Sequence, residues 1–87
     1  MHYVYTLRSI KDSDLYIGCT NDLKRRRAEH NSGKSRATAP RKPFKLVYYE
    51  AYAASEDAIR REKGLKLRGQ ARKQLMSRLS ASLQAQN

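Results

Sequence analysis

The sequence predicts an α+β fold in which helices flank a three-stranded antiparallel sheet, in the order β-β-α-β-α-α. Two observations lead to this prediction. Apolar and polar residues alternate over residues 2–8, 15–19 and 44–52, which is the pattern of strands with one buried face. The second and third of these segments are each followed by a helix-start residue and then by apolar side chains at helical spacing.

The first two strands should pair as an antiparallel hairpin. Residues 9–14 between them are polar and typical of a turn. In the first strand, Tyr3, Tyr5 and Leu7 are expected on one face, because successive side chains of a strand point to opposite sides. Several tyrosines on one short hairpin, close to basic helices, suggest phenols gathered around a phosphate.

The first helix should begin just after the hairpin. Thr20 or Asn21 can accept hydrogen bonds from the first free amides of the helix. Gly33 is expected to end the helix, because glycine readily adopts the left-handed conformation found there. Within this helix, Arg26 and His30 lie one turn apart and therefore share a face.

The rest of the chain predicts a loop, the third strand and two more helices. Residues 34–43 are basic, contain two prolines and should form a loop before that strand. Ser55 should cap the second long helix, whose first turn carries acidic residues. A break is expected at residues 68–69, followed by a third helix over residues 70–83 with a leucine-rich stripe.

The size of the chain fits a single domain. Its 87 residues are placed in one domain over residues 1–83, with residues 84–87 as a frayed tail. Neither a transmembrane helix nor a signal peptide is expected, because no apolar stretch is long enough and the N-terminus lacks a basic start. Cys19 is the only cysteine, so an intrachain disulfide and a cysteine zinc site are excluded, and a cytoplasmic location is expected.

The charge of the chain indicates a polyanionic partner. It has 19 lysines and arginines against 8 acidic residues, a formal net charge of +11. So large an excess opposes compaction by self-repulsion unless an anion offsets it. A membrane-surface helix would need aromatic anchors, and the chain has no tryptophan and one phenylalanine. Nucleic acid is therefore the expected partner, and neither a membrane nor a small-molecule cofactor is expected.

Four short motifs bear on the function. They are Tyr-Val-Tyr at residues 3–5, Tyr-Ile-Gly at residues 16–18, Asn-Asp-Leu-Lys-Arg-Arg at residues 21–26 and Arg-Glu-Lys at residues 61–63. Together they resemble the GIY-YIG nuclease family, and the resemblance looks closest to small stand-alone bacterial members that are little more than the catalytic module. In the first triplet only Tyr5 matches the functional position of the family, and no counterpart is assigned to the late asparagine of its larger members.

The resemblance implies an endonuclease that hydrolyses DNA phosphodiesters with one Mg²⁺ or Mn²⁺ ion. It implies that Tyr5 is the general base and Tyr16 a positioning group. Glu62 is the natural oxygen ligand for the ion, and Arg26 can hold a phosphate oxygen with its permanently charged guanidinium. Because a free phenol has a pKa of about 10, Tyr5 would need a neighbouring cation or metal to lower that pKa.

Each candidate residue also has a structural explanation. The tyrosines can simply fill a sheet face, Arg26 can lie on a solvated helix face, and Glu62 can pair with Lys66 one turn along its helix. His30 can line the site as a second proton carrier or phosphate donor, or it can interact with the helix end. A buried packing role is favoured for Cys19 over a nucleophilic one.

Further basic residues are predicted to follow the phosphate backbone without reading bases. They are Arg27, Lys34, Arg36, Arg41, Lys42, Arg61, Lys63 and Lys66. Since no recognition domain accompanies the motifs, the enzyme is expected to select a DNA structure or a single strand, in repair or recombination. Two alternatives stay open: a catalytically inactive DNA- or RNA-binding module on the same fold, and a ribosome-associated or other RNA-binding protein. DNA is favoured over RNA as the partner.

Overall fold

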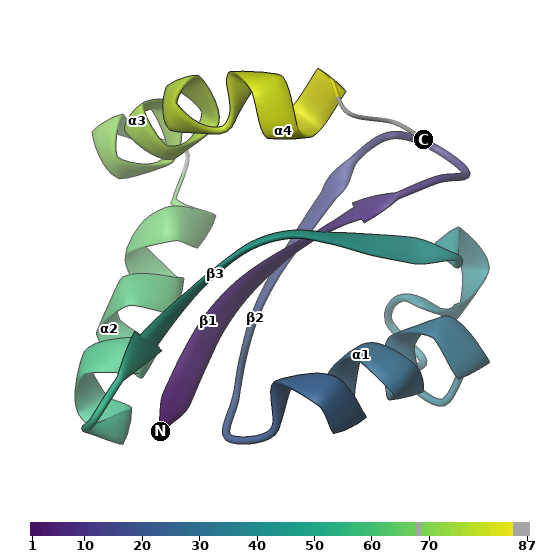
Figure 1. Cartoon of the computed structure of the whole chain (residues 1–87), viewed down its shortest axis with the longest axis horizontal. Coiled ribbons are helices and arrows are strands. Elements are labelled where there is room, and N and C mark those ends of the chain that lie inside the picture. The colour runs from purple at the N-terminus through teal and green to yellow at the C-terminus, as the bar shows by residue number, and fades with distance from the viewer. Residues whose placement is uncertain (68, 85–87) are drawn as a thin grey trace.

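The computed structural model describes residues 1–67 and 69–84. Its centre is a three-stranded antiparallel sheet formed by β1 (His2–Ser9), β2 (Leu15–Thr20) and β3 (Phe44–Tyr52), in the spatial order β2-β1-β3. The predicted hairpin is therefore confirmed, and β3 pairs with the other side of β1. Figure 1 shows the twisted strands crossing the middle of the molecule.

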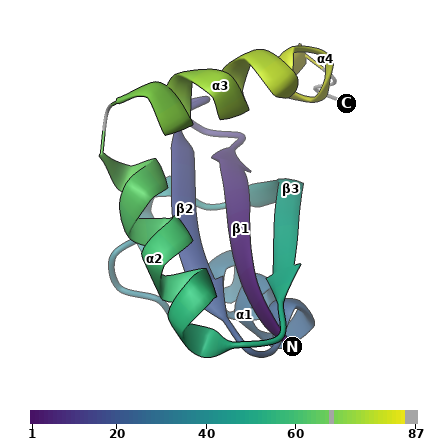
Figure 2. The same ribbon diagram turned by 90° about the vertical axis from the view of Figure 1, so that its left-hand side faces the viewer.

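Helices cover both faces of the sheet. α1 (Leu23–Ser32) lies on one face, whereas α2 (Ser55–Lys66), α3 (Gln70–Arg78) and α4 (Ser80–Gln84) lie on the other (Figure 1, Figure 2). The predicted α+β class and the order β-β-α-β-α-α are confirmed. In the described part of the chain, no helix is both long enough and apolar enough to cross a bilayer.

Because both faces of the sheet are covered, the central strand is buried. Val4, Tyr5, Thr6 and Leu7 of β1 are at most 1% exposed, although the alternating sequence predicted a strand with only one buried face. Tyr5 and Leu7 pack with Phe44 in a small cluster under α1. Val4 belongs to a larger cluster under α2 and α3. The side chains of β1 that point toward α1 are therefore as well shielded from water as those of the main core.

One irregularity decides which side chains of β3 face α1. The pairing of β3 with β1 shifts between Thr6 and Leu7, since Thr6 pairs with Tyr48 whereas Leu7 pairs with Leu46. One extra residue of β3 is thus accommodated, as in a β-bulge. As a result Leu46 and Tyr49 both lie on the face under α1, whereas Tyr48 packs with the cluster under α2.

The start of α1 differs from the prediction. Asp22, rather than Thr20 or Asn21, is the N-cap, and its carboxylate accepts a hydrogen bond from the Arg25 amide at 3.0 Å. Thr20 instead accepts a hydrogen bond from the Asp22 amide at 3.1 Å, and this local turn brings the Asp22 carboxylate to the helix start. Gly33 ends the helix with a φ of 84°, as predicted.

The start of α2 also lies one residue from the predicted position. Ala54 is the N-cap and has no side-chain hydrogen bond, and the predicted cap, Ser55, is the first helical residue. The predicted break at residues 68–69 falls between α2 and α3. Residue 68 lies outside the described residues, and Gly69 is the N-cap of α3.

The predicted third helix is in fact two helices, α3 and α4. The chain turns at Leu79, which leaves helical geometry, is 5% exposed and packs in the core cluster under α2. Leu79 belongs to that core cluster and Leu83, on α4, packs against it, so the apolar stripe continues across the turn. Of the predicted frayed tail, Gln84 ends α4, and residues 85–87 lie outside the described residues.

Candidate active site

The hairpin places the phenol of Tyr5 above the backbone of β2. Tyr5 and Gly18 are direct partners across the two strands. A Cβ atom at residue 18 would lie 2.4 Å from the hydroxyl oxygen of Tyr5 and 2.5 Å from its Cζ. Glycine is therefore required at this position so that the phenol can reach over the edge strand. Tyr16 pairs with Leu7, so it lies on the same face of the hairpin.

His30 extends from α1 to the two tyrosines. Its side chain is fully buried, and Nε2 lies 2.9 Å from the hydroxyl oxygen of Tyr5, while Nδ1 lies 2.7 Å from Oγ1 of Thr38. The ring of Tyr16 packs on the imidazole with 4.9 Å between ring centroids. Because both ring nitrogens bond to side chains, neither one caps the end of α1. Of the two locations considered for His30, the imidazole occupies the one beside the tyrosines.

One arrangement of protons gives every polar group in this chain of hydrogen bonds a partner. The buried hydroxyl of Tyr5 donates to Nε2 of His30, which must then be unprotonated. Nδ1 therefore carries the proton and donates it to Oγ1 of Thr38, whose own hydroxyl donates to the carbonyl of Ser35 at 3.4 Å. Thr38 thus selects the tautomer of His30 that accepts a hydrogen bond from Tyr5.

Burial keeps this row of hydrogen bonds neutral. It raises the pKa of Tyr5 to about 12, and the Arg26 guanidinium opposes the rise while the charge of Glu62 adds to it. Burial also lowers the pKa of His30, and the positive charge of Arg26 lowers it further. Tyr5 is therefore a protonated phenol and His30 a neutral imidazole at neutral pH.

Arg26 brings a positive charge to the same place. Its Nη1 donates to Glu29 at 2.9 Å and its Nη2 to Oγ of Ser35 at 3.4 Å. The bond to Glu29 raises the pKa of Arg26, so the guanidinium stays charged. The side chain is 31% exposed, and a guanidinium has five N–H donors, so a phosphate oxygen can bind without breaking these contacts.

Glu62 approaches from α2, on the opposite face of the sheet from α1. Its carboxylate is 20% exposed and pairs with Lys66 at 3.1 Å, which is the helix-surface pair considered from the sequence. Burial is the main cause of the raised pKa values of Tyr5 and Cys19; the negative charge of Glu62 adds to both rises, at Tyr5 less than the charge of Tyr16 does. Since Lys66 is 51% exposed, the pair contributes little to stability and can open for another cation.

The partly exposed carboxylate of Glu62 is the candidate ligand for a divalent ion. In residues 1–67 and 69–84, no group of three or more His, Cys, Asp and Glu side chains could hold a metal. Mg²⁺ keeps several of its waters and is commonly bound by one or two carboxylates together with substrate phosphates. A single, partly exposed carboxylate whose charge reaches Tyr5 fits that mode of binding, so Glu62 could hold such an ion.

The basic residues predicted to bind nucleic acid fall into two groups. The exposed ones are Arg27, Lys34, Arg36, Lys42, Lys63 and Lys66. Arg41 and Arg61 are only partly exposed, because Arg41 pairs with Asp12 at 3.0 Å and Arg61 pairs with Glu50 at 3.0 Å. The positive charge of each of these arginines is therefore already balanced by a carboxylate of the protein.

Ser35 and Thr38 belong to the site although no sequence motif indicates them. Ser35 is 8% exposed and Thr38 is fully buried. They lie in the basic loop after α1. They are buried because they bond to Arg26 and His30, and these contacts form only when the loop folds back on the helix. Small hydroxyl residues within an otherwise charged loop are the one sequence signal for them.

The sheet, its two flanking layers and the paired tyrosines form a nuclease-type fold. The family described as the GIY-YIG catalytic domain matches residues 1–75, and the chain belongs to this family. The resemblance suggested by the motifs is therefore confirmed, and it extends into α3.

Several bacterial proteins named UPF0213 are similar to this chain. The UPF0213 protein of Bacillus pumilus is 44% identical over 62 residues, which cover 70% of this chain and 62% of that protein. UPF0213 protein SH2523 of Staphylococcus haemolyticus is 42% identical over 66 residues, 75% of this chain and 79% of that protein. The solution NMR structure of UPF0213 protein BH0048 from Bacillus halodurans has a TM-score of 0.56 at 35% identity, covering 97% of this chain and 93% of that one. The chain thus spans less than two thirds of the length of the Bacillus pumilus protein.

Proposed function

We propose that the chain is a Mg²⁺-dependent endonuclease that hydrolyses phosphodiester bonds of DNA. The observation that carries this proposal is the buried bond between the Tyr5 hydroxyl and His30, next to the guanidinium of Arg26. Burying a phenol hydroxyl and an imidazole costs free energy that an apolar pair would not cost. Groups of this kind with perturbed pKa values concentrate at catalytic sites. Membership of the GIY-YIG family supports the same conclusion.

Each side chain has a role in this proposal. Arg26 binds a non-bridging oxygen of the scissile phosphate, because its planar fork matches two acceptors at once. Tyr16 holds the imidazole of His30 in place by ring packing. Glu62 would hold the ion, and Mn²⁺ could replace Mg²⁺ there. When bound, the ion supplies Lewis-acid stabilisation of phosphoryl oxygens and lowers the pKa of water.

Activity would depend on removal of the proton from the Tyr5 hydroxyl. Burial raises the pKa of Tyr5 to about 12 and lowers the pKa of His30 below its ordinary range, so transfer of the phenol proton to His30 is strongly unfavourable in the free protein. Tyr5 can act as general base only when additional positive charge lowers its pKa, since Arg26 alone does not. We therefore expect activity to depend on the divalent ion and to rise with pH.

One observation favours a second candidate, a binding module on the same fold that does not cut. The carboxylate of Glu62 is paired with Lys66, as expected of a helix-surface pair with no other task. In that case the tyrosines would hydrogen-bond or stack, and the basic residues would supply affinity for DNA or RNA.

Nicking of labelled plasmid DNA separates the two candidates. Wild-type protein should cut in Mg²⁺ and not in EDTA, whereas Glu62→Gln and Arg26→Ala should lose at least about 100-fold in rate and still bind DNA. Glu56→Gln and Arg25→Ala are matched controls, since both residues are exposed on the same two helices, and they should cut normally. Equal, faint cutting by every protein would point to a contaminant and to the binding module. Matched RNA substrates decide between the two nucleic acids.

The proposed setting is the cytoplasm, with a role in DNA repair or recombination. Cys19 is a free thiol, which is in keeping with a reducing compartment. The enzyme would select a DNA structure or a single strand. Cell fractionation tests the location, and cutting of branched, single-stranded and duplex substrates of equal length tests the selectivity.

A further inference from the structure

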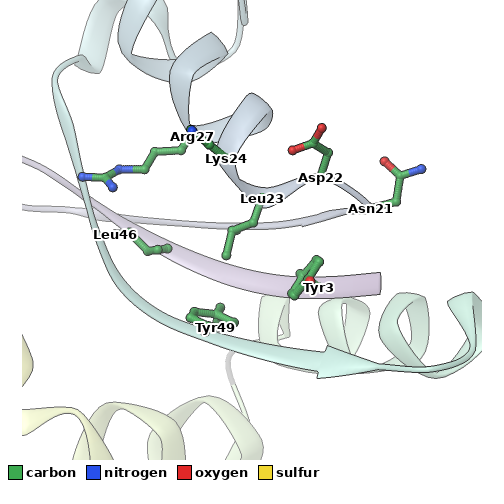
Figure 3. A pocket seen from close by; sticks show the side chains of 8 residues that line it. All are labelled: Tyr3, Asn21, Asp22, Leu23, Lys24, Arg27, Leu46 and Tyr49. Carbon is green, nitrogen blue, oxygen red and sulfur yellow. The ribbon is translucent and has the colours of Figure 1, made fainter. Parts of the chain in front are cut away.

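A concavity lies on the same face of the sheet as Tyr5, beside the start of α1 (Figure 3). Its volume is about 480 Å³, within the range of small-molecule sites. The apolar part of its lining consists of Tyr3 from β1, Leu46 and Tyr49 from β3, and Leu23 from α1. We call this concavity the α1 hollow.

Tyr49 presents an aromatic ring to water in the α1 hollow. It is 52% exposed, and it is the aromatic member of the exposed large hydrophobic side chains among the described residues. Tyr3 contacts it edge to face, with ring centroids 6.0 Å apart and ring planes at 66°. This contact holds the Tyr49 ring in place without covering it. A supported, exposed aromatic ring inside a concavity is typical of a binding surface.

Two cations of α1, Lys24 and Arg27, also line the α1 hollow. Both are exposed, and none of the ion pairs formed within residues 1–67 and 69–84 includes either of them. Asp22 lies at the same place, but its carboxylate accepts the Arg25 amide as the cap of α1. The hollow therefore combines a flat aromatic surface with two cations, which outnumber the one carboxylate in its lining.

Another hollow, on the α2 side, shows that this combination is not general. It is lined by Tyr52, Arg60 and Arg61. Arg60 pairs with Asp57 at 3.1 Å, and Arg61 pairs with Glu50 at 3.0 Å. Its cations are thus matched inside the protein, so it has no comparable attraction for an anion.

We propose that the α1 hollow binds one unpaired nucleotide of the strand that is cut, with its base stacked on Tyr49 and its phosphates held by Lys24 and Arg27. The proposal rests on the proposed function, because the same strand must pass Tyr5. The face of a base is open to an aromatic side chain only where the base is unpaired, since bases within a duplex stack on one another. An acidic peptide would match the cations but not the flat aromatic ring.

The α1 hollow lies on the β3 side of Tyr5, whose phenol extends over the other neighbouring strand, β2. Tyr49 is the direct partner of Tyr5 in the pairing of β1 with β3, and Tyr3 pairs two residues away in the same strand. Neighbouring strands are about 4.8 Å apart. Arg27 also follows Arg26 directly along α1. Successive nucleotides of one strand can therefore occupy the α1 hollow and the active site together.

Binding measured in EDTA tests the α1 hollow without any cutting. Anisotropy of a labelled single-stranded oligonucleotide and of a blunt duplex of equal length gives both affinities. Tyr49→Ala should weaken single-strand binding roughly 5- to 150-fold and change duplex binding less than about twofold. Tyr49→Phe keeps the ring and should bind as wild type. Ile10→Ala, at a residue 58% exposed in the turn between β1 and β2, is the matched control and should bind normally.

The salt dependence of binding separates the contribution of the Tyr49 ring from that of the cations. Arg27→Ala should reduce the slope of log affinity against log salt for the single strand by about 0.7, the value for one phosphate contact. Tyr49→Ala should weaken binding and leave that slope unchanged, because stacking releases no counterions. A changed slope for Tyr49→Ala, or an unchanged one for Arg27→Ala, contradicts the assigned roles.

Photocrosslinking tests the contact in wild-type protein. An oligonucleotide carrying one 5-iododeoxyuridine is irradiated in the complex, and the modified peptide is mapped by mass spectrometry. An adduct on Tyr49 or Tyr3 supports the α1 hollow, and adducts confined to other residues contradict it. Equal losses on single strand and duplex for Tyr49→Ala also contradict it. Crosslinking needs no divalent ion, so it does not depend on cutting. A protein that crosslinks through Tyr49 but does not cut DNA refutes the nuclease proposal alone. A Tyr49→Ala variant that cuts normally and keeps its single-strand affinity refutes the α1 hollow alone.

Discussion

Two clusters on opposite faces of the sheet each combine tyrosines with an arginine, but their charges are matched differently. The Glu50 cluster under α2 consists of Glu50, Tyr48, Tyr52 and Arg61, and the Tyr5 cluster under α1 consists of Tyr5, Tyr16, Arg26 and His30. Glu50 accepts hydrogen bonds from two tyrosine hydroxyls, one of them on Tyr52, and from both Nε and Nη2 of Arg61. That cluster is closed, since its anion and its cation face each other. Under α1, Arg26 pairs with Glu29, whereas Tyr5 bonds to the neutral imidazole of His30, so no anion meets the phenol directly.

The pKa values of Tyr5 and Tyr52 reflect this difference in charge matching. The pKa of each phenol is raised to about 12, mainly by burial. At Tyr52 the hydrogen bond to Glu50 raises the pKa further, whereas at Tyr5 the Arg26 guanidinium opposes the rise. A closed cluster holds its protons and stabilises the fold. An open cluster can change its protonation when a cation or a phosphate arrives.

Truncation of Glu50 should give the largest effect. Glu50→Ala leaves Arg61 partly buried without its anion, so we expect a loss of about 3 kcal/mol in the free energy of unfolding. Glu62→Ala removes a pair whose lysine is 51% exposed and should cost less than about 0.5 kcal/mol. Urea unfolding of both variants measures the two values. Equal losses would mean that the clusters do not differ as described.

An added methyl group at residue 18 should disturb the Tyr5 cluster next most strongly. Gly18→Ala drives Cβ into the phenol of Tyr5, so we expect a loss of about 1–3 kcal/mol in the free energy of unfolding, together with slower nicking. Gly64→Ala is the control, because a Cβ there meets no atom within 4 Å, and it should stabilise α2 by about 1 kcal/mol. Thermal unfolding and nicking assays measure both. Unchanged nicking in Gly18→Ala would show that the position of Tyr5 is not critical.

Removal of the Thr38 hydroxyl should have a smaller effect. Thr38→Val keeps the shape but removes the acceptor for Nδ1 of His30, which should cost about 1 kcal/mol in the free energy of unfolding. The tautomer of His30 should become mixed, and nicking should slow. Nitrogen NMR shifts of the imidazole report the tautomer directly. A variant that keeps a single Nδ1–H tautomer would show that Thr38 does not select it.

Lowering the pH should have the smallest effect, by protonating Glu50. Burial acts to raise the pKa of Glu50, but hydrogen bonds from Arg61, Tyr48 and Tyr52 outweigh it and hold the pKa below its ordinary value. The resulting stability is complete above the carboxyl's ordinary pKa of about 4.3 and is lost as pH falls toward the lower folded value. Urea unfolding between about pH 6 and pH 3 should show this loss in wild type. Glu50→Gln should lack that part of the pH dependence.

The bounds of the strands could be predicted because alternation is a local pattern. Residues 44–52 were predicted as a strand, and β3 has the same bounds. The split at Leu79 could not be predicted, since it depends on the core that Leu79 enters. The cap of α1 was missed because several neighbouring polar side chains could reach the same amide, and only the turn at Thr20 decides that Asp22 does.

The candidate site was predictable to the extent that one hairpin and one helical turn define it. Pairing of β1 with β2 sets Tyr5 over Gly18, and the spacing of α1 puts Arg26 and His30 on one face. The contribution of Thr38 was not predictable, because the loop that carries it must first fold back on α1. The same is true of the α1 hollow, since the bulge in β3 determines which of its side chains face that helix.

The way α1 docks on the sheet has a consequence for engineering. Of the residues of α1, all of which the structure describes, His30 is the buried one. The helix is therefore anchored by the same imidazole that accepts the hydrogen bond of Tyr5. An apolar replacement would avoid the cost of burying ring nitrogens and is expected to stabilise the fold, but it would remove the hydrogen-bond acceptor of Tyr5. Under the proposed function, thermal stability and the rate of cutting make opposite demands on residue 30, and a search for more stable variants should find inactive ones there first.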